Sequence, residues 1–203
     1  DYVDVDMNQD MQAFADKLTI AGIPVEQVEY WGTEVKKVKT GKILQIDKHP
    51  DADKLVVCQV DMGDEQLQIV TAATNVRVGQ IVPVAVHGAH LPGGTKIKRS
   101  KLRGVLSNGM FCSAHEFGFD DSLLLPEERE GIWILPPDTP LGVDAADYLQ
   151  VRDVVYEYEL TANRADCFSM VGLSREFAVL SGKEARYPDI SVKECDTPID
   201  GKV

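Results

Sequence analysis

Short apolar runs separated by turn residues make up the middle of this chain. The runs lie at residues 43–46, 55–60, 67–70, 81–86 and 109–112. Short strands with frequent turn signals are typical of a β-sandwich or a small barrel. Five strands within about a hundred residues fit the size of an OB-type barrel, although size alone leaves the sandwich open.

The two flanks follow a different pattern. Met11, Phe14 and Leu18 recur at helical spacing, and a short strand is expected near residues 25–30. Residues 154–160 alternate as a strand does, and a second helical spacing runs from Met170 to Leu180. One helix and one strand bury too little apolar surface to fold alone, so each flank is expected to pack on another part of the chain.

Composition and charge exclude several classes of protein. Apolar residues make up 44% and charged residues 27%, an ordinary globular balance. With 21 basic and 33 acidic residues the net charge is −12, which excludes a polycation but not a local basic patch. No apolar run approaches the roughly 20 residues of a membrane helix, so no membrane partner is expected. The chain starts at Asp1 and shows no leader, which suggests a piece of a longer protein.

The four cysteines stand far apart and form no C-x-x-C pair. They are Cys58, Cys112, Cys167 and Cys195. This spacing predicts free thiols without zinc, in a reducing cytosolic setting.

The strongest binding candidate is the run from Lys96 to Arg103, which holds five cations in eight residues. Read as one strand, it places Lys96, Lys98 and Ser100 on one face. The other face then carries Arg99, Lys101 and Arg103. A second cationic group consists of Lys36, Lys37, Lys39 and Lys42. Phosphate binding requires clustered cations, but a merely solvated hairpin has the same composition.

Other motifs carry weaker signals. His49, Asp51 and Asp53 suggest either a tight turn or a metal site. Cys112 with His115 suggests either packed residues or a nucleophile pair. Phosphate-binding glycine loops and a Ser-His-Asp pattern are absent from the sequence, so no catalytic residue is assigned.

The central segment resembles the tRNA-binding OB domain of the endothelial-monocyte-activating-polypeptide type. The resemblance rests on His49-Pro50-Asp51-Ala52-Asp53-Lys54-Leu55, on Gly88-Ala89-x-Leu91-Pro92-Gly93-Gly94, and on Leu102-Arg103-Gly104-Val105-x-Ser107-x-Gly109-Met110-x-Cys112-Ser113. Residues 71–75 depart from the pattern, since many relatives have Gly-Ala-Pro-Asn there. This departure affects a turn.

The flanks resemble those of bacterial phenylalanine–tRNA ligase beta chains. The segment Glu159-Leu160-Thr161-Ala162-Asn163-Arg164-Ala165-Asp166-Cys167-Phe168-Ser169 carries this resemblance, together with Ala21-Gly22-Ile23-Pro24-Val25-Glu26. It implies a five-stranded OB-fold barrel, residues 39–150, inserted into a small α+β domain built from 1–38 and 151–190. Residues 191–203 are then a linker toward a next domain.

The resemblance also implies a function. Such ligases are heterotetramers of two alpha and two beta chains, act in the cytoplasm, and use ATP and Mg²⁺. The alpha chain carries the aminoacylation site, so this segment is expected to hold no cofactor and to contact tRNA. The expected tRNA-binding residues are Lys42, Lys54, Asn75, Lys96, Lys98, Arg99, Lys101, Arg103, Ser107 and Met110. The alternatives are a free-standing tRNA-binding module, or an OB domain that binds another single-stranded nucleic acid or a sugar.

Overall fold

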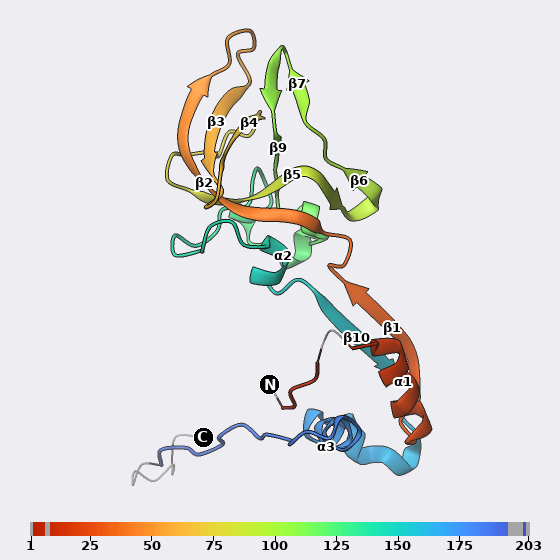
Figure 1. The fold of residues 1–203 in the computed structure, drawn as a ribbon. Coiled ribbons are helices and arrows are strands. Elements are labelled where there is room, and N and C mark those ends of the chain that lie inside the picture. The colour runs from red at the N-terminus through yellow and green to blue at the C-terminus, as the bar shows by residue number, and fades with distance from the viewer. Residues whose placement is uncertain (1, 7–8, 195–200, 202–203) are drawn as a thin grey trace. The chain divides into compact units, whose positions relative to one another are not determined.

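A computed structural model describes residues 2–6, 9–194 and 201 (Figure 1). These residues divide into two compact units: the flank unit, residues 1–29 with 155–203, and the barrel unit, residues 30–154. The helices are α1 (Met11–Ile20), α2 (Ala145–Tyr148) and α3 (Met170–Ser181). The strands are β1 (Val25–Trp31), β2 (Lys36–Lys48), β3 (Val56–Asp61), β4 (Gln66–Thr71), β5 (Ile81–Leu91), β6 (Thr95–Lys96), β7 (Ser100–Leu102), β8 (Val105–Ser107), β9 (Gly109–Phe111) and β10 (Asp153–Tyr158).

The barrel unit contains a curled antiparallel sheet in the order β4-β3-β2-β5-β6, with β9 also paired to β5, and a separate two-stranded sheet of β7 and β8 (Figure 1). The chain around residues 107–111 brings the sheet's two sides together. While β9 pairs with β5, the N–H of Asn108 donates to the Gln68 carbonyl at 2.9 Å. The prediction of an OB-type barrel within a mixed β and α+β chain is thereby confirmed.

Alternation along the strands builds the barrel core. Ile43, Cys58, Val60, Ile69, Val82 and Val84 are fully buried and belong to one cluster. A second cluster gathers around Val35, Val38 and Ala85. Arg152 fixes the chain near these residues by donating to the Val35 carbonyl at 2.8 Å and pairing with Asp144 at 3.1 Å.

The flank unit has a smaller core. Phe14 and Leu18 of α1 pack with Phe177 of α3, and the rings of Phe14 and Phe177 lie 5.2 Å apart. The Tyr156 hydroxyl donates to the Met11 carbonyl at 2.8 Å. Residues from the two ends of the chain therefore share one core.

The helix starts use short polar caps. Asp10 accepts from the Ala13 N–H and begins α1. The sequence alone also predicts Asp6 or Asn8 as the cap of this helix. For Asp6 that prediction is wrong, and Asn8 lies outside the described residues. Ser169 begins α3 by accepting from the Gly172 N–H. Asp166, which the sequence also predicts as a possible cap of α3, instead binds Arg164. No helix in the described part of the chain is long and apolar enough to cross a membrane.

Candidate nucleic-acid interface

The basic run is not the single strand that its alternation predicts. Lys96 ends β6, Lys98 and Arg99 lie in the following connection, and Lys101 is in β7. Arg103 and Gly104 then adopt left-handed backbone conformations, with φ of 47° and 90°, and turn the chain into β8. All five cations of the run are exposed. The charge pattern gave no sign of this turn, whereas Gly104 is the residue that a left-handed turn favours.

His49 joins the turn after β2 to this hairpin. Its Nδ1 accepts from the Asp51 N–H at 3.1 Å, which leaves Nε2 to donate to the Leu102 carbonyl at 2.9 Å. The ring is only 6% exposed and both nitrogens are used, so His49 has no free position for a metal. Among the residues described by the structure, no group of three potential ligands forms a metal site.

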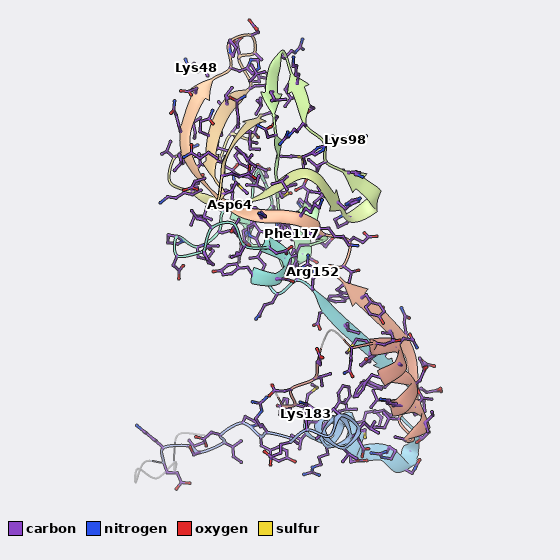
Figure 2. All side chains as sticks on the ribbon, viewed as in Figure 1. Lys48, Asp64, Lys98, Phe117, Arg152 and Lys183 are labelled. Atoms are coloured by element: carbon purple, nitrogen blue, oxygen red, sulfur yellow. The ribbon has the colours of Figure 1, made fainter. Side chains whose placement is uncertain are left out.

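The bond from His49 brings cations from two loops to the same end of the barrel. Lys54 is exposed in the turn after β2, and Lys101 and Arg103 are exposed on the hairpin. Figure 2 places Lys48 near the end of β2 and Lys98 between β6 and β7. We call Lys54, Lys98, Arg99, Lys101 and Arg103 the hairpin surface.

Three of the expected contact residues face inward instead. The Ser107 hydroxyl, in a residue 1% exposed, donates to the Gly109 carbonyl and accepts from the Val70 N–H. The Met110 side chain is half-buried against the second core cluster.

Asn75 has a structural role. Its amide donates to and accepts from the backbone of Ile132, at 2.8 and 3.0 Å. These positions favour structural roles for Asn75, Ser107 and Met110. A sequence motif does not distinguish a side chain that closes a barrel from one that contacts a ligand, and for this reason the three residues were expected to bind tRNA.

The lysines of β2 have separate environments. Lys39 lies 3.7 Å from the Asp64 carboxylate, which neutralises its charge locally. Lys42 is exposed beside its cross-strand partner Asp61. Neither residue belongs to the hairpin surface.

The Cys112 and His115 pair does not form an activated nucleophile. Burial raises the pKa of the Cys112 thiol and so keeps it protonated. The His115 ring contacts the carbonyls of Phe119 and Arg129, which raise the pKa of His115. Burial likewise raises the pKa of Cys58 to about 11, with a further contribution from Asp47.

Arg164 holds a polar cluster in the flank unit. Its guanidinium lies 3.1 Å from the Asp166 carboxylate and 2.6 Å from that of Glu176, while Asn163 remains exposed. The Arg164 contact lowers the pKa of Asp166. The arrangement ties the segment before α3 to the helix and satisfies the charge of Arg164 within the chain.

The sequence analysis did not identify a row of three glutamines on the barrel sheet. Gln45, Gln59 and Gln68 lie opposite one another across β2, β3 and β4. Gln59 and Gln68 are hydrogen-bonded at 3.3 Å, and Gln68 also donates to the Leu106 carbonyl of β8. The alternation of β3, with Cys58 and Val60 inward, already placed Gln59 outward.

Comparisons with known proteins cover both units. The family model described as "Putative tRNA binding domain" matches residues 38–144. The chain is 54% identical over 92% of its length to the phenylalanine–tRNA ligase beta subunit of Moorella thermoacetica. It is 45% identical over 96% of its length to that of Syntrophus aciditrophicus, and 47% identical over 96% to that of Clostridium acetobutylicum. The matches span only 23–24% of the length of these relatives.

Among solved structures, the chain is similar to a MetRS related protein from Pyrococcus horikoshii. The sequences are 22% identical, the TM-score is 0.37, and the match covers 52% of this chain and 84% of that one.

Proposed function

The chain belongs to the tRNA-binding domain family, and from this we propose that it is the tRNA-binding N-terminal region of a phenylalanine–tRNA ligase beta subunit. The observation that carries the proposal is that the similarity extends over 92–96% of the chain. It therefore includes the flank unit, which a free-standing OB module would lack. In the complete ligase, ATP and Mg²⁺ serve the aminoacylation reaction, and the partners are an alpha subunit and tRNA in the cytoplasm.

Within this region, we propose that the hairpin surface attracts the phosphate backbone of tRNA. Its cations are exposed, and none forms an ion pair with an acidic side chain among the described residues. The net charge of −12 repels RNA at long range, but screening confines that repulsion to about 8–10 Å at physiological salt. Because no aromatic residue is interleaved between Lys96 and Arg103 for stacking, backbone shape rather than base identity should determine binding.

Measuring tRNA affinity across a salt series tests this function. Replacing Lys98, Arg99 and Lys101 together with glutamine should weaken binding of unrelated tRNAs alike. It should also reduce the slope of log affinity against log salt by roughly 2 to 3, since each phosphate contact contributes about 0.7–0.9. An unchanged affinity and slope would mean that the hairpin surface is not the contact.

A further inference from the structure

A second group of cations lies in the barrel unit, away from the β7–β8 hairpin. Lys36 of β2, His90 of β5 and Lys96 of β6 are direct cross-strand partners, so they form one row across three strands. All three side chains are exposed. Directly opposed residues have Cβ atoms about 4.5–5.5 Å apart, so the two lysines flank the His90 ring on either side. The three side chains therefore gather two formal positive charges and an imidazole on one patch of the sheet.

Control of the sheet edge is one explanation of the two lysines. Lysine on an edge strand blocks pairing with other chains, and β6 is an edge strand. Lys36 lies in the part of β2 that pairs with β5, before the pairing with β3 begins at Lys42, so β3 does not cover Lys36. Neither Lys36 nor Lys96 forms an ion pair with an acidic side chain in the described part of the chain.

An irregularity in the sheet adds another cation beside the row. The pairing of β2 with β5 shifts between Lys36 and Val38, where Lys37 adopts a left-handed conformation with φ of 58°. Across from it Gly88 has φ of 83°, and a Cβ on Gly88 would lie 3.5 Å from the Lys37 ammonium. Left-handed backbone is unfavourable for lysine, and bulges commonly redirect side chains beside functional sites.

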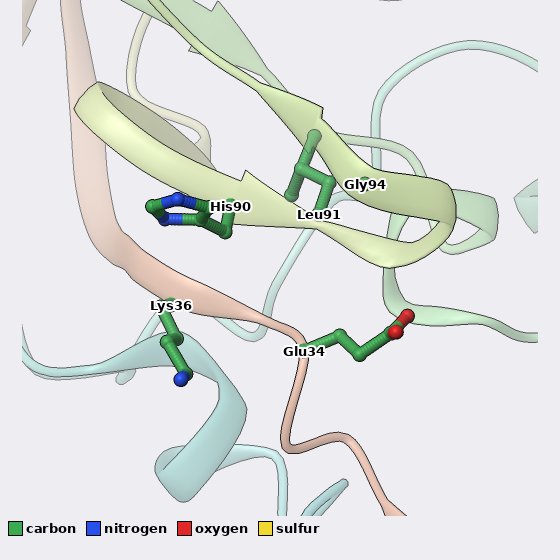
Figure 3. Close-up of a pocket in the computed structure, with 5 residues that line it drawn as sticks. All are labelled: Glu34, Lys36, His90, Leu91 and Gly94. Carbon is green, nitrogen blue, oxygen red and sulfur yellow. The ribbon is translucent and has the colours of Figure 1, made fainter.

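The row borders a hollow of about 220 Å³. Its lining consists of Glu34, Lys36, His90, Leu91 and Gly94. Figure 3 shows Lys36 and His90 projecting from neighbouring strands, while the Glu34 carboxylate is directed away from the Lys36 ammonium. The hollow is smaller than the roughly 300–1,000 Å³ of typical small-molecule sites. It suits a single anionic group of a larger molecule better than a whole nucleotide.

We propose that Lys36, Lys37, His90 and Lys96, the basic row, form a second phosphate-binding surface for the same RNA. The inference rests on the proposed function. Lys98 and Arg99 follow Lys96 with only Ile97 between them, so the cations of the basic row continue into the hairpin surface. The residues from 96 to 103 span at most about 29 Å when fully extended. One RNA backbone thus meets cations from β2 to the hairpin.

The test compares two variants that each lose two formal positive charges. One carries Lys36→Gln, His90→Gln and Lys96→Gln. The matched control carries Lys17→Gln and Lys183→Gln, both exposed in the flank unit. Loss of two phosphate contacts should reduce the salt slope of tRNA binding by about 1.4–1.8. With an unchanged affinity at 1 M salt, this corresponds to binding roughly 25- to 60-fold weaker at 0.1 M.

Each outcome bears on a different claim. If the wild-type chain binds tRNA and the row variant keeps the same slope, the basic row is wrong while the proposed function stands. If the control lowers the slope equally, overall charge is responsible and the row is again wrong. If the wild-type chain does not bind tRNA, the proposed function fails and the row with it.

Two further measurements separate charge from folding and RNA from small anions. Lys36→Arg with Lys96→Arg keeps the charge and should retain wild-type binding, and all variants should keep the wild-type melting temperature. Inorganic tripolyphosphate serves as a small anionic probe. If the row variant loses tripolyphosphate binding but keeps tRNA binding, the site takes a small polyphosphate and the RNA assignment is overturned.

Discussion

The barrel unit and the flank unit bury their apolar side chains to different extents. The barrel strands pair around a core in which Ile43, Val60 and Val82 are fully buried. The fully enclosed core of the flank unit is small, and large apolar side chains remain open to solvent, with Ile20 87%, Phe168 75% and Val179 77% exposed. Stability scales with buried apolar area, so the two units should differ in how well they fold alone.

Separating the units should have the largest effect. We propose that residues 30–154 fold without the flank unit, whereas residues 1–29 and 155–203 fold only together. This segment should unfold cooperatively when expressed alone, while 1–29 or 155–203 alone should remain unfolded, because each flank lacks the other half of its core. Thermal melts followed by circular dichroism measure this. A cooperative transition from either isolated flank contradicts it, and joining 1–29 to 155–203 through a short glycine-rich linker should restore folding.

The two units also differ in how much of their structure could be predicted from the sequence. Short apolar runs between turn residues located the strands around Ile43, Val60 and Val82, because that pattern is local in the sequence. The hydrogen bond from Tyr156 to Met11 joins residues 145 positions apart in the sequence. Periodicity does not predict such a contact, and only the family resemblance implied that the two flanks form one domain. The turn at Arg103 and the buried bonds of Ser107 depend on tertiary contacts that a charge pattern does not encode.

Replacing one glycine with alanine in each unit should show the next largest difference in stability between the two units. A Cβ on Gly172 of α3 would lie 1.8 Å from the Asp166 carbonyl oxygen, and one on Gly109 would lie 2.3 Å from that of Ala85. Gly→Ala inside a helix normally gains about 1 kcal/mol. Gly172→Ala should instead cost about 1–3 kcal/mol through overpacking. Hydrogen exchange should show α1 and α3 opening in this variant.

Gly109→Ala provides the comparison in the barrel unit. It should cost a similar amount of free energy, yet the strands should stay protected from exchange because the larger core has more stability to lose. Gly172→Ala that stabilises α3 would show that the segment around Asp166 relaxes freely.

The labelling rates of the buried cysteines should show a smaller difference between the two units. Cys58 and Cys112 in the barrel unit and Cys167 in the flank unit are all buried free thiols. Labelling therefore requires opening of the surrounding structure. We expect Cys167 to react faster than Cys58 and Cys112 in the native protein, although all three are shielded. A Cys195→Ser background removes the fourth thiol. Equal labelling rates would mean that both units open together.

The N-terminal cap of α3 should contribute less to the stability of the flank unit than its apolar core does. Ser169→Ala removes the acceptor of the Gly172 N–H and should cost about 0.5–2 kcal/mol. Asp166→Ala should not show this capping loss, since the Asp166 carboxylate contacts Arg164 rather than the helix start. Protection of α3 amides measures both variants. A larger loss for Asp166→Ala would reverse these roles.

The pH dependence of the flank unit should be the smallest effect. Arg164 lowers the pKa of Asp166, so the folded chain favours the carboxylate more than the unfolded chain does. This contribution is present above the ordinary Asp pKa of about 3.9 and is lost as the pH falls through the lower folded value. Asp166→Asn should flatten the acid side of the stability profile of α3, measured as protection factors between pH 6 and pH 3. Asp120 has a lowered pKa in the barrel unit, where its carboxylate accepts from the Ser122 N–H, so Asp120→Asn serves as the control and should leave α3 unchanged. If Asp166→Asn retains the full acid sensitivity of the wild type, the Arg164 contact does not stabilise the flank unit.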